Sequence, residues 1–211
     1  DTAVVDAGRG YTRCGSGISM TSSTGYGISK YDIKEIANAY RNQPNANFTH
    51  APLFWLAVIY LQYAEATAEL GTITQSDLDN SINKLRTRAG LPALTVGVGF
   101  NDPANNMAVS NLIWEIRRER RSELMLDNWN HYWDLVRWHQ LDKLDSSVYP
   151  DVLLGANIVN APAYDKAVQK VGTYIDGSKK MSRKYDKKYY WYPIPSDQIS
   201  LNDKLSQNPN W

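Results

Sequence analysis

The stretch "PLFWLAVIYLQYAEATAEL" at residues 52–70 decides the fold class of this chain. Pro52 suits the first turn of a helix, because the N–H that proline lacks would have no partner there. Apolar residues surround the helix axis through Tyr63, and Gly71 is a favourable residue for the helix end. A helix that is apolar on nearly all sides is buried on most of them, so the stretch predicts the central helix of a helical domain.

A second helix is expected after a short loop. Ser76 is expected to cap it, and Asp77 and Asp79 place carboxylates in the first turn, where the helix dipole favours negative charge. The two helices together predict an αα-hairpin, which is the unit of tetratricopeptide-like repeats. The apolar stripe of the second helix, which ends at Gly90, consists of Leu78, Ile82, Leu85 and Ala89.

A third helix is expected from Ser110 through "NLIWEIRRERRSELML" (residues 111–126). Its glutamates stand one turn apart, which is a spacing that two catalytic carboxylates could use. Arginines interleave them, however, and Arg–Glu pairs at helical spacing usually form a structural network. We therefore expect this helix to hold structure and not to catalyse. The residues concerned are Glu115, Glu119 and Glu123 with Arg117, Arg118, Arg120 and Arg121.

Composition excludes several classes of protein. The 211 residues carry 23 basic and 22 acidic side chains, a net charge of +1, whereas nucleic-acid-binding domains usually have a clear basic excess. The basic run "GSKKMSRKYDKK" (residues 177–188) is therefore interpreted as a solvated loop. No apolar run reaches the length of a membrane helix, and "DTAVVDAGRG" at the start lacks the pattern of a signal peptide.

Neither the cysteine nor the histidines predict a reactive or metal site. Cys14 could be lipidated or nucleophilic, but it lacks an apolar segment upstream and an evident partner, so we interpret it as an incidental loop thiol. His131 and His139 are too far apart for a metal pair one helical turn apart, and His50 is remote. We expect no metal and no cofactor.

Aromatic side chains are the feature of the composition that points to a ligand. The chain has 7 Trp and 14 Tyr but only 3 Phe, and rings with a polar group suit surfaces that are partly wet. We expect the helical Trp55, Trp114, Trp133 and Trp138 in the core. Ring-bearing loops are the better ligand candidates, and the candidate residues are Tyr11, Tyr26, Tyr31, Tyr40, Tyr149, Tyr164 and Tyr174.

Three blocks of sequence carry a resemblance to one family. "ERRSELMLDNWNHYWDLVRW" (residues 119–138) resembles a signature of SusD/RagB-like nutrient-binding proteins. "YLQYAEATAELG" followed by "INKLRTRAGLP" is similar to the helix pair before that signature. The tail "WYPIPSDQISLNDKLSQNPNW" (residues 191–211) is similar to the C-terminal end of the family. The chain departs from the pattern at His131, where an Arg is expected, and at Asn210, where Gly is frequent.

The resemblance implies a mainly α fold with tetratricopeptide-like helix pairs, long irregular loops and an extended C-terminal strap. It implies a surface lipoprotein of the Bacteroidetes outer membrane that binds oligosaccharide for nutrient uptake. Its partner would be a SusC-like TonB-dependent transporter, and its membrane contact a lipid anchor on an N-terminal part that precedes this chain. Catalysis, cofactors and nucleic acid are not expected.

The chain is expected to be the C-terminal part of such a protein. Residues 1–50 are expected to be irregular, with a strand near residues 27–31 and ligand loops. Residues 51–144 would form the helical core, and residues 145–211 loops and the strap. Pro193 and Pro195 favour extended backbone there. Ser196 is expected to cap a turn, and the apolar anchors onto the helices would be Ile194, Ile199, Leu201 and Leu205.

Two alternative functions remain. One is a helical-repeat module that binds only protein, which would show a flat apolar patch rather than aromatic rings around a concavity. The other is a glycan hydrolase, which needs two carboxyl groups roughly 5–9.5 Å apart across a cleft. We find no such pair in the sequence outside the arginine-rich third helix, so glycan binding is the leading hypothesis.

Overall fold

The computed structural model describes residues 13–14, 21–22, 24, 26, 53–127, 130–159, 170–178 and 181–211. The chain divides into two compact units. One is His50–Gln140, and the other combines Asp1–Thr49 with Leu141–Trp211. Helices dominate the described residues, which confirms the predicted mainly α fold class. The predicted strand near residues 27–31 lies outside them.

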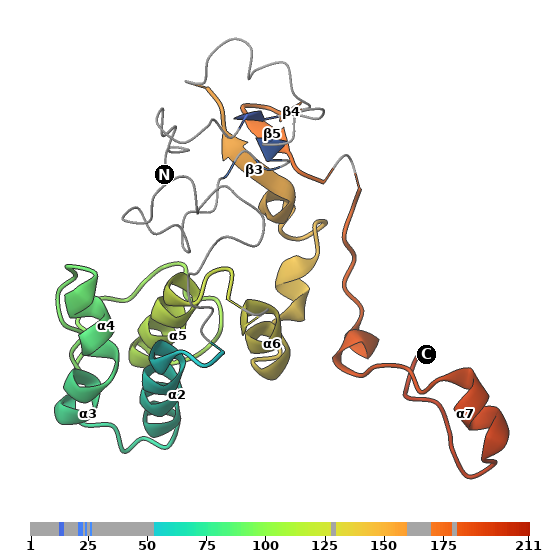
Figure 1. The fold of residues 1–211 in the computed structure, drawn as a ribbon, viewed down its shortest axis with the longest axis horizontal. Helices are drawn as coiled ribbons and strands as arrows, with labels where there is room; N and C mark the ends of the chain where they lie inside the picture. Colours follow the sequence, from blue (N-terminus) through green and yellow to red (C-terminus); the bar gives the residue numbers. More distant parts are fainter. Residues whose placement is uncertain are drawn as a thin grey trace, which may run out of the picture. The chain divides into compact units, whose positions relative to one another are not determined.

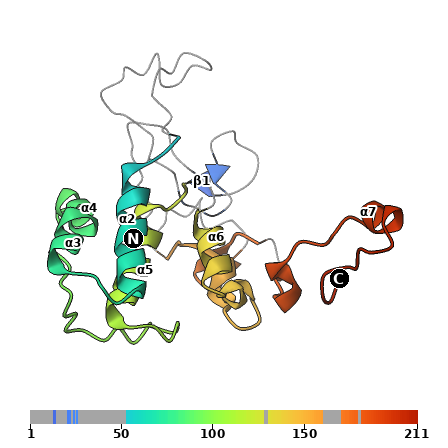
Figure 2. The ribbon, with the colours of Figure 1, turned by 90° about the horizontal axis from the view of Figure 1, so that it is seen from below.

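The unit His50–Gln140 is helical. In Figures 1 and 2, α2 and α5 lie side by side, with α3 and α4 on one side of them and α6 on the other. None of the helices in the described ranges is both long and apolar enough to cross a membrane. The helices are α2 (Leu56–Glu69), α3 (Gln75–Asn80), α4 (Ile82–Arg88), α5 (Asn111–Glu123) and α6 (Asn130–Arg137).

Helix α2 ends as predicted but is less buried than predicted. Gly71 follows it with a φ of 69°, the left-handed conformation that glycine adopts without strain. The prediction of burial on most sides is wrong, because α3, α4 and α5 cover one face only. On the opposite face, Leu56 is 62% exposed, Ile59 54% and Tyr63 46%.

The predicted second helix is in fact two helices. Ser81 lies between α3 and α4 with φ −129° and ψ −101°, and its Oγ donates to the carbonyl of Asp77. Thr74, not Ser76, caps α3. The Thr74 side chain accepts from the Asp77 N–H, and the Asp77 carboxylate accepts from the Thr74 N–H, which is a capping box. The apolar stripe continues through the break.

One buried amide fixes the connection between α4 and α5. Asn83 is 5% exposed. Its Nδ2 donates to the Leu94 carbonyl at 2.9 Å, and its Oδ1 accepts from the Leu94 N–H at 2.7 Å. The side chain thus replaces a strand partner for Leu94. Helix α5 starts after Ser110, as predicted, and the Ser110 side chain caps it by accepting from the Ile113 N–H.

The core of the helical unit joins α2, the α3–α4 pair and α5. Fully buried side chains of α2, α3, α4 and α5 meet there, so burying this layer is the main source of stability for the unit. Its buried members are Ala57, Leu61, Ala64, Leu78, Ile82, Leu85, Leu94, Ile116 and Leu124.

The other unit contains a small antiparallel sheet that the sequence did not predict. Its order is β3-β5-β4, and Asn157 of β3 pairs with Tyr174 of β5. A cluster of Ala156, Ile158 and Ile175 is buried on it. The strands are β3 (Leu154–Asn157), β4 (Lys170–Val171) and β5 (Tyr174–Asp176), and a separate parallel pair consists of β1 (Arg13–Cys14) and β2 (Thr21–Ser22).

Short 3-10 helices precede this sheet and lead into the tail: η1 (Leu141–Leu144), η2 (Pro150–Leu153) and η4 (Lys187–Tyr190). Hydrogen bonds attach the segment that precedes the tail to η1 and to the residues that follow it. The Tyr185 N–H donates to the Asp145 carboxylate at 3.0 Å, and the Ser146 N–H donates to the Arg183 carbonyl. The Leu141 N–H donates to the Tyr190 hydroxyl.

The end of the tail closes on itself around α7 (Ser196–Leu201). The Gln207 amide donates to the Ile194 carbonyl and accepts from the Ile194 N–H, both at 2.8 Å. Pro195 is the N-cap of α7 and Ser196 makes no capping bond, so the predicted Ser196 cap is wrong. Leu201 is 81% exposed. Docking of the tail onto the helices stays a prediction.

Candidate functional site

Three of the seven candidate tyrosines lie in the described residues, and all three belong to the unit with the small sheet. They are Tyr26, Tyr149 and Tyr174. Tyr26 is 49% exposed and Tyr174 39% exposed, whereas Tyr149 is half-buried. The other four candidates, Tyr11, Tyr31, Tyr40 and Tyr164, lie outside the described residues.

Backbone contact attaches Tyr26 to the sheet. The Ala156 N–H of β3 donates to the Thr24 carbonyl at 2.8 Å, two residues before Tyr26. Gly155 makes this approach feasible, because a Cβ there would lie 2.5 Å from the Thr24 carbonyl oxygen. A contact that short would force the backbone apart. Gly155 is therefore a requirement for seating the segment that carries Tyr26 against β3.

Tyr174 and Tyr149 reach the same sheet by other routes. Tyr174 lies in β5, opposite Asn157 of β3. Tyr149 precedes η2, which leads directly into β3. Tyr174 thus lies in the sheet, the segment of Tyr26 bonds to it, and Tyr149 precedes it along the chain. An exposed tyrosine such as Tyr174, paired across the sheet with the amide side chain of Asn157, offers the flat face and the hydrogen-bonding groups that sugars need.

The helical tryptophans are less buried than predicted. Trp133 is 51% exposed, which makes its assignment to the core wrong. Trp55, Trp114 and Trp138 are half-buried. The indole N–H groups of Trp114 and Trp138 donate to Asp102 and Glu65 at 3.0 and 2.7 Å, because a buried indole N–H needs an acceptor.

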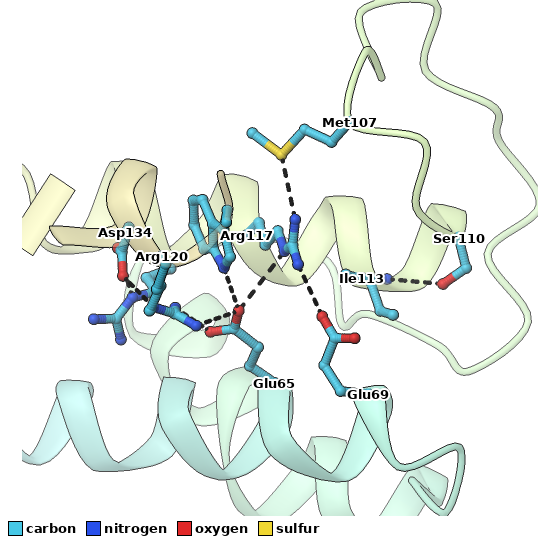
Figure 3. A network of polar contacts seen from close by, with 10 residues as sticks. Glu65, Glu69, Met107, Ser110, Ile113, Arg117, Arg120 and Asp134 are labelled. Carbon is cyan, nitrogen blue, oxygen red and sulfur yellow. Dashed lines mark hydrogen bonds and ion pairs between the residues drawn. The ribbon is translucent and has the colours of Figure 1, made fainter. Parts of the chain in front are cut away.

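A polar cluster of arginines and carboxylates lies between α2 and α5, and Glu65 is at its centre (Figure 3). Glu65 is 5% exposed. It accepts two hydrogen bonds from Arg137, at 2.9 and 2.5 Å, and one from Trp138. The Arg117 Nε lies 3.7 Å from its Oε1. Burial raises the pKa of Glu65, but Arg137, Trp138 and Arg117 outweigh burial and lower it below its ordinary value.

The same cluster continues along α5 and α6. Arg117 donates to Glu69 at 2.9 Å. Asp134 accepts from the Nε of Arg120 at 2.7 Å and from the Nε of Arg137 at 2.9 Å. The guanidinium carbons of Arg117 and Arg137 lie 4.7 and 4.8 Å from the centre of the Trp138 ring. These cation–π contacts occupy the indole and leave it poorly suited to stack on a sugar.

Each glutamate of the predicted carboxylate series is paired with an arginine. Glu119 pairs with Arg86 at 2.6 Å and Glu123 pairs with Arg88 at 2.6 Å, both on α4. Glu115 pairs within α5, with Arg118. The expected pairing along one helix is therefore wrong for Glu119 and Glu123, whose ion pairs join α5 to α4. Paired carboxylates of this kind hold structure, and no cluster of His, Cys, Asp and Glu suited to a metal occurs in the described ranges.

A hollow of about 510 Å³ opens beside the polar cluster. The sequence analysis missed it. The sequence did contain a signal for a polar site here: Glu65 and Glu69 lie one turn apart on a largely apolar helix. Carboxylates buried in such a helix require basic partners from elsewhere in the fold. The lining residues are Gln62, Glu65, Ala66, Glu69, Arg117, Arg120, Arg137 and Trp138.

The family model of the SusD family matches residues 5–211. The chain belongs to the SusD family. This confirms the resemblance carried by the three sequence blocks. No curated protein matches the chain.

The solved structures that are similar to this chain include two SusD-like examples. One, titled BT4246, has 25% identity and a TM-score of 0.55, with coverage of 79% of this chain and 25% of that chain. The other is a SusD-like protein (BF3747) from Bacteroides fragilis NCTC 9343, with 25% identity, a TM-score of 0.49, and coverage of 74% and 25%. This SusD family chain thus spans about a quarter of the length of these structures.

Proposed function

We propose that this protein binds oligosaccharide at the bacterial cell surface and delivers it to a SusC-like TonB-dependent transporter in the outer membrane. The family match over residues 5–211 supports this proposal most directly. A lipid anchor on a preceding part of the protein would hold it at the membrane. The role is binding and not catalysis, because the candidate carboxylates of α5 are engaged with arginines.

The sheet with its tyrosines is the proposed glycan-binding surface. Sugars have flat C–H faces that stack on aromatic rings, and each such contact contributes about 0.5–1.5 kcal/mol. Two or three rings therefore give weak binding, with a Kd near the millimolar range. Weak binding suits a protein that must release its ligand to a transporter. Two exposed tyrosines support this proposal: Tyr174, which lies in β5, and Tyr26, which follows the Thr24 carbonyl that accepts from β3.

A glycan array identifies the ligand, and calorimetry then tests the surface. Tyr26→Ala and Tyr174→Ala should each weaken binding by about 2- to 10-fold, which is the loss of one stacking contact. Tyr192→Ala is the matched control, since Tyr192 is a 69% exposed tyrosine in the tail. An equal loss in the control would reject the sheet as the site. Absence of binding to every glycan would reject the proposed function.

A second candidate function is a module that binds only protein. The exposed apolar face of α2, with Leu56 and Ile59, favours it. Light scattering over a range of concentrations tests it with Ile59→Glu. Concentration-dependent association that Ile59→Glu abolishes, together with a negative glycan array, would support this candidate over the first.

A further inference from the structure

One face of the small sheet carries an exposed row of side chains across its three strands. Asn157 of β3 lies opposite Tyr174 of β5, and Tyr174 lies opposite Val171 of β4. The side chains of directly opposed residues lie on the same face of a sheet. Tyr174 is 39% exposed, Val171 is 55% exposed and Asn157 is exposed. An aromatic ring therefore lies in the middle of the row, between an amide and an isopropyl group.

A tight turn and a buried neighbour hold this row in place. Only Gly172 and Thr173 separate Val171 from its partner in β5. Gly172 has a φ of 61°, which glycine adopts without strain and which suits a two-residue hairpin loop. Ile175, the residue after Tyr174, is 3% exposed, as alternation along a strand predicts for the opposite face. The row is thus built on paired strands and not on a loop.

The Asn157 side chain is oriented so that it presents hydrogen-bond donors. Its Oδ1 accepts from the Val159 N–H at 3.1 Å, which is an Asx turn. Its Nδ2 has no acceptor among the residues that the structure describes. Asn105 makes the same turn with Met107, but there Nδ2 donates to the Val109 carbonyl. Asn157 therefore offers two N–H groups to a ligand, on an exposed side chain.

We infer that this row is a subsite for an N-acetylated sugar, an N-acetylhexosamine. The inference rests on the proposed function, because it takes the sheet as the glycan-binding surface. The acetamido group has a carbonyl oxygen, which only accepts, and a methyl group on the same carbon. The Asn157 amide supplies donors for the carbonyl. Val159, whose N–H orients that amide, is 54% exposed and supplies apolar surface for the methyl group.

The aromatic ring suits the rest of the sugar. Tyr174 provides a flat face for the C–H groups of the pyranose, beside the amide. A sugar with a hydroxyl in place of the acetamido group would lose the methyl contact and offer Asn157 a hydroxyl instead of an amide carbonyl. One hydrogen bond and one methyl contact together correspond to about tenfold in affinity. The row should therefore select N-acetylated sugars over their hydroxyl counterparts.

Titration of the 211-residue chain with N,N′-diacetylchitobiose and cellobiose tests the inference. The two disaccharides differ only at C2 of each ring, where one has an acetamido group and the other a hydroxyl. The readout is the side-chain NH2 resonance of Asn157 in nitrogen-15 NMR spectra, assigned by its loss in Asn157→Asp. We expect diacetylchitobiose to shift this resonance with a Kd about tenfold lower than that of cellobiose. Equal Kd values, or no shift with diacetylchitobiose, would overturn the inference.

Two aspartate variants test the role of the amide. Asn157→Asp keeps an acceptor for the Val159 N–H and removes the two donors. Its Kd for diacetylchitobiose, measured by saturation-transfer NMR, should rise to that of cellobiose. Asn202→Asp is the matched control, because the Asn202 Oδ1 accepts from the Lys204 N–H at the same 3.1 Å, in the tail. It should leave both Kd values unchanged. A preference retained in Asn157→Asp, or an equal loss in Asn202→Asp, would show that the Asn157 amide does not select the acetamido group.

The outcomes also separate this inference from the proposed function. Oligosaccharides without N-acetyl groups could bind in a manner that Tyr174→Ala weakens, while diacetylchitobiose leaves the Asn157 resonance unshifted. That result would reject the acetamido subsite and leave the glycan-binding function standing. A diacetylchitobiose shift at Asn157 without binding of any longer oligosaccharide on the array would support the subsite and reject the wider function.

Discussion

Glu119→Gln should destabilise the helical unit without affecting ligand binding. The Glu119 side chain is 11% exposed and that of its partner Arg86 is 14% exposed, with 2.6 Å between the charged atoms. Glutamine keeps an oxygen acceptor but removes the charge, so the buried guanidinium loses its counter-ion. Arg86 retains a hydrogen bond from its Nε to the Pro92 carbonyl. We therefore expect a loss of about 2–3 kcal/mol, below the full cost of breaking a buried pair.

Glu123→Gln is the matched control. Glu123 pairs with Arg88 at the same distance, but the Arg88 side chain is 63% exposed. Exposed ion pairs contribute about 0–1 kcal/mol, so this variant should lose less than about 1 kcal/mol. The two substitutions are chemically identical and lie one turn apart on α5. Burial of the arginine is therefore the main difference between them.

Urea unfolding followed by circular dichroism at 222 nm measures both losses, since the helices lie mostly in one unit. For a chain of this size, each 1 kcal/mol corresponds to about 2–4 °C in Tm. Equal losses in the two variants would refute the argument from burial. A hydrolytic rate that Glu119→Gln removes from a folded protein would refute the structural role of α5.

Four further predictions follow from the fold and the site. Gly155→Ala should push the Thr24 backbone away from β3 and weaken glycan binding, which calorimetry measures, while Gly97→Ala, in open space, should not. Because the pKa of Glu65 is lowered, its ion pairs stabilise the fold at every pH above the ordinary pKa of a glutamate, and this stability is lost as the pH falls through the lowered pKa. The free energy of unfolding, measured with urea, should therefore decline less steeply in acid for Glu65→Gln than for the unchanged protein. Affinity for a neutral oligosaccharide should barely change between low and high salt. A steep fall in affinity with salt, for any bound polymer, would instead support the basic run at residues 177–188 as a polyanion site. The chain spans about a quarter of the similar structures and leaves one face of α2 exposed, so it should bind glycan more weakly than a longer SusD protein that includes it. Equal affinities of the two proteins in calorimetry would place the whole site within these 211 residues.

Helices could be predicted from the sequence where local chemistry determines them. The end of α2 at Gly71 and the start of α5 at Ser110 follow from backbone freedom and capping, which act within a few residues. The break at Ser81 could not be predicted, because the stripe of Leu78, Ile82 and Leu85 keeps its period through it. A side-chain bond from Ser81 to a backbone carbonyl interrupts the helix without changing the apolar pattern.

The sheet and the site depend on contacts that no local pattern shows. Strands β3, β4 and β5 have two to four residues each, too few for alternation to be visible. The tyrosines could be chosen by ring type, but the attachment of the Tyr26 segment to β3 depends on the bond between Ala156 and Thr24, which are far apart in sequence. Likewise, the helical spacing of Glu119 and Glu123 suggested partners on the same helix, whereas packing supplies Arg86 and Arg88 from another.

The division of the chain into two units also determines the order in which they can fold during synthesis. His50–Gln140 is continuous, so a ribosome can release all of it and its helices can close their core at once. The unit with the sheet is interrupted by that insertion. The Thr24 carbonyl cannot accept its hydrogen bond from Ala156 until the residues that follow the helical unit have emerged. Thr24 is thus made before the helical unit but can bond to β3 only after it, and a translational pause between the two would lengthen the exposure of Thr24 to proteases and chaperones.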